Sequence, residues 1–239
     1  GTGRFGRLWA QALATRHTVR TYNRSRRPVP DGCRAATLSE VASCDAVFLC
    51  VAISAMDAVV RELAPLVSPG TAVLDTCSVK VYPTQVMEAH LPDSVPVIGT
   101  HPMFGPDSAR TGMSGLPLVL SPVRCSSRLA QTWRSEFDAM GLRVITMSPE
   151  DHDREAAFTQ GITHFVGRVL ADMEIKPSPI ATVGYERLLA VMEQTCNDPY
   201  QLFVDLQQYN PYTTEMRKEL QASLSRLLDS LESRLDTAS

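Results

Sequence analysis

The chain opens on a glycine-rich turn, Gly1-Thr2-Gly3-Arg4-Phe5-Gly6, with the spacing of a dinucleotide-binding motif. In such a turn the first glycine makes the tight bend, the second lets the backbone approach a pyrophosphate, and the third lets helix and strand pack closely. The helix that follows would offer free N–H groups and a partial positive charge to the phosphates. The sequence lacks the strand that should precede the turn, so we expect the natural chain to begin further upstream.

The first part of the chain alternates short apolar runs with helical patterns, which is typical of βαβ units. The run at 46–51 is almost continuously apolar, as expected for a parallel strand buried on both faces. We predict strands at 18–22, 46–51, 72–75, 95–99, 116–121 and 143–147. We predict helices at 6–15, 38–42, 56–66, 81–91 and 127–140. Residues 1–148 are therefore expected to form an α/β domain, a doubly wound dinucleotide-binding (Rossmann) sheet.

From residue 149 the strand signals disappear and longer helical patterns take over. We predict helices at 150–173, 184–196, 199–209 and 212–235, and hence an all-helical C-terminal domain over 149–239 that closes over the substrate. One stripe of the last helix carries Leu220, Leu224, Leu227, Leu231 and Leu235. This stripe is expected to pack either on a second subunit, giving a homodimer through the helical domain, or within its own subunit.

The composition is that of a soluble globular protein, with 44% hydrophobic and 21% charged residues. A net charge of -3 provides no field that would attract nucleic acid or an anionic membrane. No apolar run approaches the roughly 20 residues that a membrane helix needs. The six cysteines form no CxxC pair, and no His/Cys spacing indicates zinc. We expect reduced thiols, no metal, and a location in the cytoplasm, or in the plastid if the source is a plant or alga.

The residues after the second predicted strand indicate which nicotinamide cofactor is used. An NAD enzyme usually has Asp or Glu there, which holds the ribose 2′-hydroxyl. This chain has Asn23, Arg24 and Ser25, followed by two more arginines. Guanidinium and hydroxyl groups would hold a 2′-phosphate, so we predict NADP, with NAD as the alternative and a solvated basic loop as the other interpretation. The predicted cofactor contacts are Gly1, Gly3, Phe5, Gly6, Asn23, Arg24, Ser25 and Val51.

A histidine stands in the most informative segment, Gly99-Thr100-His101-Pro102-Met103-Phe104-Gly105-Pro106-Asp107-Ser108. The segment follows a predicted strand at the edge where open α/β sheets bind substrates. Two prolines and a glycine fix it as a loop that faces the cofactor, and such preorganised loops carry function. His17, His90 and His152 have no such context and are expected to be exposed.

The string HPMFGPDS resembles the prephenate/arogenate dehydrogenase family of tyrosine biosynthesis, and the resemblance extends over nearly the whole chain. It includes residues 75–80 and 160–165, and residues 196–198 with Tyr209-Asn210 resemble the plant-type arogenate enzymes in particular. The family reaction is an oxidative decarboxylation of a small cyclohexadienol. Hydride leaves C4 for the nicotinamide, CO2 leaves C1, and the ring becomes aromatic.

By this resemblance His101 takes the proton of the C4 hydroxyl, a task that suits a neutral imidazole with an ordinary pKa of about 6.5. Ser78 matches the family serine that hydrogen-bonds the substrate hydroxyl and orients the histidine; its alternative role is a helix N-cap. His164 matches a second family histidine on the substrate side. Its alternative role is that of a hydrogen-bonded core histidine.

Two positions bear on the choice between arogenate and prephenate. Gln194 stands where the prephenate enzymes have the arginine that holds a carboxylate, and Asp198 stands where plant-type arogenate enzymes have an acid. A carboxylate there would attract the ammonium group of arogenate, so we predict arogenate as substrate. The alternative is that Asp198 only caps the helix beginning at Pro199. The candidate cations for the substrate carboxylates are Lys80, Arg110, Arg187 or a residue of a second subunit.

Other functions remain open from the sequence. Prephenate is expected as a lesser or equal substrate, and the alternative function is that of a prephenate dehydrogenase giving 4-hydroxyphenylpyruvate. Other two-domain reductases, such as β-hydroxyacid dehydrogenases and imine reductases, rely on a lysine in the helical domain, where only Lys176 and Lys218 occur and neither is well placed. A non-catalytic NADP-sensing protein would keep the fold, but the intact pair of Ser78 and His101 argues against it.

Overall fold

The computed structural model describes residues 1–236. The chain divides into two compact units, Gly1–His152 and Asp153–Ser239. The predicted domain boundary, between residues 148 and 149, lies at the start of helix α6 (Pro149–Ala156), and the division between the two units falls inside this helix.

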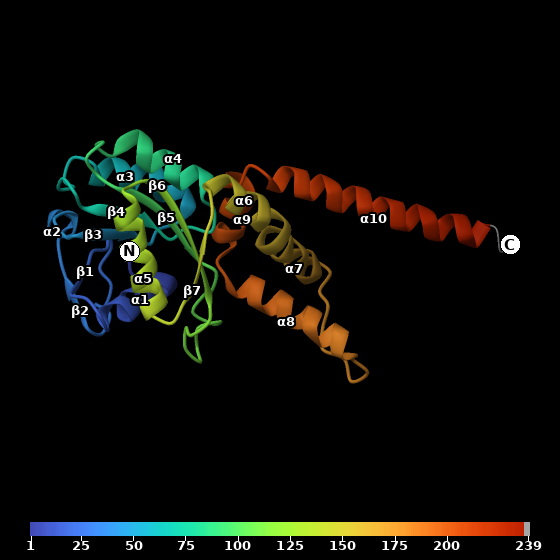
Figure 1. Ribbon diagram of the computed structural model, residues 1–239. Helices are drawn as coiled ribbons and strands as arrows, with labels where there is room; N and C mark the ends of the chain where they lie inside the picture. The colour runs from blue at the N-terminus through green and yellow to red at the C-terminus, as the bar shows by residue number, and fades with distance from the viewer. Residues whose placement is uncertain (237–239) are drawn as a thin grey trace. The chain divides into compact units, whose positions relative to one another are not determined.

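The strands of the first unit form two sheets (Figure 1). In the smaller sheet β1 (Val19–Thr21) pairs in parallel with β2 (Cys33–Ala35). The larger sheet has the order β3-β4-β5-β6-β7, in which only β5 and β6 pair antiparallel. Its strands are β3 (Ala46–Leu49), β4 (Ala72–Asp75), β5 (Val97–Pro102), β6 (Pro117–Arg124) and β7 (Arg143–Thr146). Every residue of β4 and β5 is buried, as expected for strands covered on both faces.

Helices cover both faces of the larger sheet (Figure 1). α1 (Arg4–Ala14) and α5 (Ser127–Ala139) lie on one face, where the rings of Trp9 and Phe137 have centroids 5.9 Å apart. Phe48 of β3 contacts both rings. α3 (Met56–Leu63) and α4 (Val81–His90) lie on the other face. The shorter helices are α2 (Leu38–Ala42) and the 3-10 turn η1 (Ile53–Ala55).

The second unit is helical. The single helix predicted over 150–173 is instead α6, a π-helical segment η2 (Ala157–Gly161) and α7 (Ile162–Asp172). α8 (Val183–Asn197), α9 (Tyr200–Tyr209) and α10 (Thr213–Asp236) follow. α7 and α8 pack closely because Gly167 has no side chain: a Cβ atom there would lie 2.1 Å from Oγ1 of Thr195.

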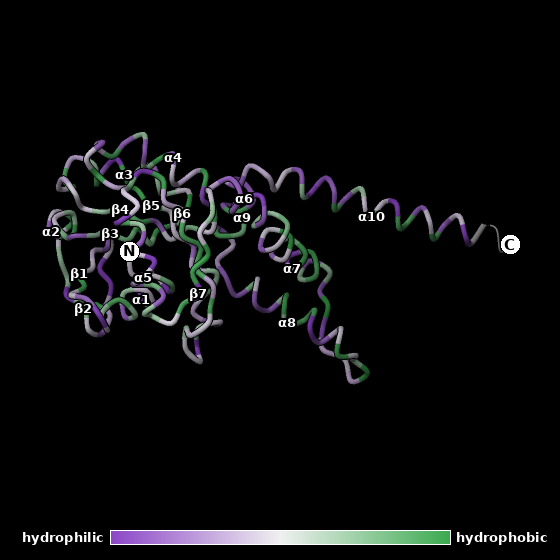
Figure 2. Tube along the Cα trace, viewed as in Figure 1, coloured by the Kyte–Doolittle hydropathy of each residue, from purple (hydrophilic) through white to green (hydrophobic). Residues whose placement is uncertain are grey.

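The leucine stripe of α10 lies largely in solvent. Leu224, Leu227 and Leu231 are between 58% and 63% exposed, and Leu220 is half-buried. The side chain of Leu235 lies outside the described residues. Figure 2 shows hydrophobic residues recurring among polar ones along α10. The other helices of this unit therefore leave the stripe uncovered. Along residues 1–236, no helix is both long and apolar enough to cross a membrane.

Candidate active site

The glycine-rich turn lies beside the carboxyl end of β3. A Cβ atom at Gly6 would lie 2.0 Å from the carbonyl oxygen of Gly1, and one at Gly1 would lie 3.0 Å from the carbonyl oxygen of Cys50. A Cβ atom at Gly3 would meet no atom within 4 Å, so the backbone there faces open space. Gly3 is also the N-cap of α1, and no side chain caps this end of the helix. This turn fits a pyrophosphate held by backbone N–H groups at a helix N-terminus.

Asn23 holds the glycine-rich turn against the end of β1. Its Oδ1 accepts a hydrogen bond of 2.5 Å from the backbone N–H of Thr2, and its Nδ2 donates to Oγ1 of Thr2. The next residues are exposed, and none of them forms an ion pair with another described side chain: Arg24, Ser25, Arg26 and Arg27. Their positive charge is therefore presented to solvent directly after β1.

Two contacts join the glycine-rich turn to the loop that follows His101. Nη2 of Arg4 donates to Oδ2 of Asp107 at 2.8 Å. The ring of Phe5 stacks on Trp9 and tilts against Phe104, with centroids 5.9 and 6.4 Å away. The side chain of Phe5 thus belongs to the core, which leaves its backbone for the predicted cofactor contact. Val51, the remaining predicted contact, is half-buried directly after β3.

We predicted that His101 lies in a loop, and this prediction is wrong, because His101 lies on strand β5. The strand runs on to Pro102 because β6 supplies an antiparallel partner, with His101 opposite Val119. The side chain is only 3% exposed. Burial, followed by the neighbouring His152 and the cation of Lys80, holds the pKa of His101 well below its ordinary value. The imidazole is therefore neutral at neutral pH and has a nitrogen that can accept a proton.

His152 was predicted to be exposed, and this prediction is wrong. It is 2% exposed, and its Nε2 lies 2.8 Å from Nδ1 of His101. The two rings meet edge to face, with centroids 5.1 Å apart and planes at 68°. The surrounding residues 150–153, Glu-Asp-His-Asp, resemble a solvated helix start, and no spacing in the sequence indicates the pairing with His101. His90 is likewise not fully exposed, since its Nε2 lies 2.9 Å from Oδ1 of Asp57 and its side chain is 22% exposed.

A buried ion pair lies beside His101. Lys80 and Asp75 are both fully buried, and Nζ of Lys80 donates to Oδ2 of Asp75 and, at 2.7 Å, to the carbonyl oxygen of Thr100. Asp75 also accepts from the backbone N–H groups of Cys77 at 2.8 Å and Thr100 at 3.2 Å. These bonds fix the residue that precedes His101. The predicted role of Lys80 as a substrate ligand does not agree with this geometry, because its ammonium group is committed to Asp75 and Thr100.

Ser78 is half-buried in the segment between β4 and α4. The N-cap of α4 is Lys80, and the helix begins at Val81. The alternative in which Ser78 caps this helix is therefore wrong, which leaves its hydroxyl for the predicted bond to substrate.

In the second unit, His164 on α7 is 7% exposed. Burial lowers the pKa of His164, and the nearby Arg168 acts in the same direction while Asp198 opposes it. Among the described residues, neither Nδ1 of His164 nor Oε1 of Gln160, one turn earlier, has a hydrogen-bond partner although both atoms are buried. His164 is thus not a hydrogen-bonded core histidine. Two buried polar atoms without partners indicate room for water or a ligand.

Arg168 is a cation that sequence reasoning missed, although its four-residue spacing from His164 puts both on one face of α7. Its Nη2 donates to the carbonyl oxygens of Thr195 at 3.1 Å and Asp198 at 2.9 Å. Its guanidinium carbon lies 5.5 Å from the ring centroid of Tyr200. This places a fixed positive charge beside the half-buried Asp198.

Asp198 ends α8, and Pro199 is the N-cap of α9 without a side-chain cap bond. The alternative in which Asp198 caps α9 is therefore not what the structure has. Gln194 is exposed on α8. The second unit thus brings together His164, Arg168 and Asp198, a base, a cation and a carboxylate.

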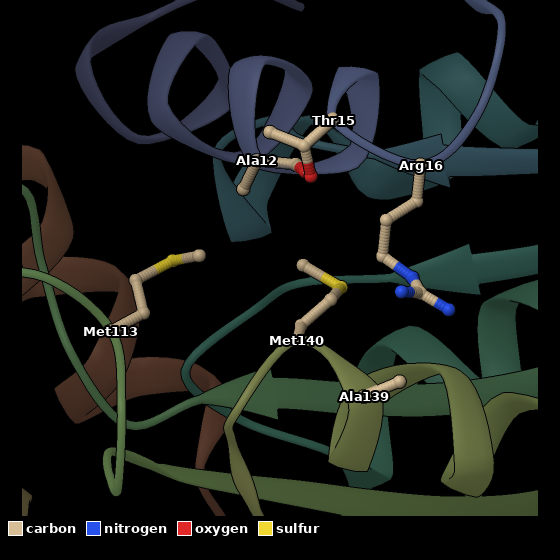
Figure 3. A pocket seen from close by; sticks show the side chains of 6 residues that line it. All are labelled: Ala12, Thr15, Arg16, Met113, Ala139 and Met140. Carbon is tan, nitrogen blue, oxygen red and sulfur yellow. The ribbon is translucent and has the colours of Figure 1, made fainter.

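A surface pocket of about 350 Å3 lies between the end of α1 and the end of α5 (Figure 3). Polar and apolar atoms line it in similar proportion, and its one charged side chain, Arg16, donates to Glu136 at 3.2 Å. The pocket contains no predicted site residue, so we assign it no chemistry. Within residues 1–236, no group of three or more His, Cys, Asp or Glu side chains is placed to hold a metal ion.

Comparisons with known proteins agree with these features. Residues 16–131 match the model of the prephenate dehydrogenase nucleotide-binding domain, and residues 169–239 match that of the TYRAAT1-like C-terminal domain. Arogenate dehydrogenase 2, chloroplastic, of Arabidopsis thaliana is 36% identical over 80% of the chain, and arogenate dehydrogenase 1, chloroplastic, of the same plant is 31% identical over 98%. The chain spans 55% and 39% of the lengths of these relatives.

A solved structure shares the fold. Prephenate dehydrogenase from A. aeolicus, in complex with hydroxyphenyl propionate and NAD+, superposes with a TM-score of 0.73 and covers 97% of this chain and 88% of its own. It is 18% identical, so the likeness concerns the fold.

Proposed function

This chain belongs to the prephenate/arogenate dehydrogenase family, and on that basis we propose that it catalyses the NADP-dependent oxidative decarboxylation of arogenate to tyrosine. The observation that carries the proposal is the buried, neutral imidazole of His101 on a strand whose following loop contacts the glycine-rich turn. The proposed location is the cytoplasm, or the plastid if the source is a plant or alga, and both Arabidopsis relatives are named chloroplastic.

In the proposed reaction, NADP when bound supplies the acceptor for the C4 hydride. His101 accepts the proton of the C4 hydroxyl through Nε2 as that hydride leaves. Ser78 donates to or accepts from the same hydroxyl and orients it. The C1–CO2 bond then breaks, its electron pair enters the ring, and the phenolate oxygen takes the proton back from His101. The imidazole ends as it began, and no net proton is released.

Arg24 and the residues after it are proposed to hold the 2′-phosphate of NADP. They are exposed, carry no acid among them and stand directly after β1. The change Arg24→Asp should move the preference from NADP toward NAD, because a carboxylate repels the 2′-phosphate and accepts from the ribose hydroxyl. Kinetics with both cofactors measure this, with Arg128→Asp, a change at an exposed residue of α5, as the matched control. Cofactor ratios that do not change in Arg24→Asp would refute this role.

Asp198 is proposed to bind the ammonium group of arogenate, and Arg168 a carboxylate of the same substrate. Nη2 of Arg168 donates to the backbone carbonyl oxygen of Asp198 at 2.9 Å, and the exposed Gln194 supplies no charge. Asp198→Asn should therefore raise prephenate turnover relative to arogenate turnover, because it removes the attraction for an ammonium group. Asp172→Asn, at the end of α7, serves as control. An arogenate-to-prephenate ratio equal to that of the unchanged protein would contradict the assignment.

A homodimer through α10 is proposed because Leu224, Leu227 and Leu231 are each more than half exposed. Sedimentation velocity should show a dimer that dissociates when Leu227 and Leu231 are both changed to Glu. A monomer at micromolar concentration in the unchanged protein would rule this out.

The direct test of the function assays purified protein with arogenate and prephenate and with NADP and NAD, following reduction at 340 nm. Arogenate-dependent NADP reduction should be lost in His101→Ala and retained in His90→Ala. Preferred turnover of prephenate would make the chain a prephenate dehydrogenase. Binding of NADP without turnover of either cyclohexadienol would favour the non-catalytic sensor.

A further inference from the structure

The contact between His101 and His152 has chemical consequences that depend on which nitrogen carries the proton. Nδ1 of His101 and Nε2 of His152 are 2.8 Å apart, a hydrogen-bond distance, and both side chains are almost fully buried. Two neutral imidazoles can form this bond only if one nitrogen carries hydrogen and the other offers a lone pair. There are thus two arrangements of the pair.

The two arrangements differ in what they leave at the opposite side of the His101 ring. If Nδ1 of His101 carries the hydrogen, its Nε2 has a lone pair and can accept a proton. If Nε2 of His152 carries the hydrogen, Nε2 of His101 must carry one as well and can only donate. In serine proteases, loss of the residue that selects the tautomer of the catalytic histidine lowers kcat by about 10⁴-fold.

We propose that His152 is a positioning residue that accepts a hydrogen bond from Nδ1 of His101 and thereby keeps Nε2 of His101 as the proton acceptor. His152 needs to touch neither substrate nor cofactor for this role. The inference rests on the proposed function only in giving Nε2 of His101 a proton to accept.

An imidazole partner suits this site better than a carboxylate would. The groups that face His101 are His152 from α6 and Lys80 before α4, and Lys80 is itself bound to Asp75. His152 fixes the tautomer without adding a negative charge that would favour the imidazolium form of His101. His101 therefore stays unprotonated in the resting protein and takes up a proton only during the reaction.

The tautomer can be read without any turnover. The full chain is labelled with 15N-histidine, and its five histidines are assigned by single substitutions. At pH 8 we expect a protonated Nδ1 and an unprotonated Nε2 in His101, and an unprotonated Nε2 in His152. A proton on Nε2 of His101 would overturn the proposal.

Two variants separate positioning from simple packing. In His152→Gln the amide oxygen stands near the place of Nε2 and can still accept from Nδ1, whereas in His152→Leu nothing can. We expect kcat to fall about 100-fold or more in His152→Leu and to stay within about ten-fold in His152→Gln, with KM for NADP unchanged in both. His90→Leu removes a partly buried histidine elsewhere in the same unit and should leave kcat unchanged. A folded His152→Leu variant with full kcat would overturn the proposal.

The two hypotheses fail separately. Without turnover in the unchanged protein but with the expected tautomer, the proposed function fails and the positioning stands. With turnover but a proton on Nε2 of His101, the positioning alone fails.

Discussion

The buried pair of Lys80 and Asp75 allows the sharpest test of the energetics around His101. In Lys80→Met the apolar stem keeps most of its volume, but Asp75 keeps a carboxylate in a fully buried position without its cation. Removing one partner of a buried ion pair typically costs about 3–5 kcal/mol. That is a large share of a total stability of about 5–15 kcal/mol. A melting temperature lower by about 6–20 °C is expected for a unit of this size.

Urea unfolding of the full chain measures the loss, and a double-mutant cycle assigns it. Asp75→Asn combined with Lys80→Met leaves no buried charge, so the double variant should be more stable than the sum of the single changes predicts. Lys218→Met, an exposed change on α10, is the control and should stay within about 0.5 kcal/mol of the unchanged protein. A loss below about 1 kcal/mol in Lys80→Met, with an additive double variant, would refute the reasoning.

Three further predictions concern pH and glycines. The free energy of unfolding should fall as the pH decreases below about 6.5, by up to about 1.4 kcal/mol per pH unit for each buried histidine. The reason is that His101 and His164 have lowered pKa values, so the unfolded chain takes up protons that the native chain does not. Equal urea midpoints at pH 7.5 and pH 5.5 would contradict this. Gly167→Ala should cost about 1–3 kcal/mol, because its Cβ atom would collide with Oγ1 of Thr195, and Thr195→Ala should restore part of the loss in the same unfolding assay; no recovery would exclude that collision as the cause. Gly6→Ala should lower both the melting temperature and the NADP affinity in calorimetry. Gly3→Ala should lower only the NADP affinity, because its Cβ atom would lie in open space. A drop in melting temperature for Gly3→Ala would argue against the open backbone described above.

Local patterns were sufficient for most of the fold. The apolar runs at 46–51 and 72–75 became β3 and β4, because a strand buried on both faces needs apolar side chains on both. Strand β2 was not predicted, since Cys33–Ala35 is short and contains the exposed Arg34. Strand β5 is longer than predicted because its end depends on backbone partners in β6, about twenty residues later in the chain.

In the candidate site, too, the sequence predicted the residues that lie in recognisable local motifs and missed those that only the fold brings together. The glycine-rich turn and His101 were found because each lies in a short, specific string of residues. The partners of His101 were not, since His152 is 51 residues away in the sequence and only the folded backbone brings the two rings together. The sequence predicts Lys80 as an accessible cation, because no neighbouring residue indicates that its stem is buried against Gly99. A Cβ atom at Gly99 would lie 3.3 Å from Cδ of Lys80.

The π-helical segment between α6 and α7 changes the direction in which the side chains of α7 point around the helix axis. One extra residue in such a segment turns everything after it by about 100° relative to a continuous α-helix. Deleting a single residue there would restore α-helical hydrogen bonding, yet it would rotate the face of α7 that carries His164 and Arg168. The chain thus keeps a segment whose local hydrogen bonding is less favourable than that of an α-helix. An ancestral insertion of one amino acid would have turned the imidazole of His164 to its present direction in a single step.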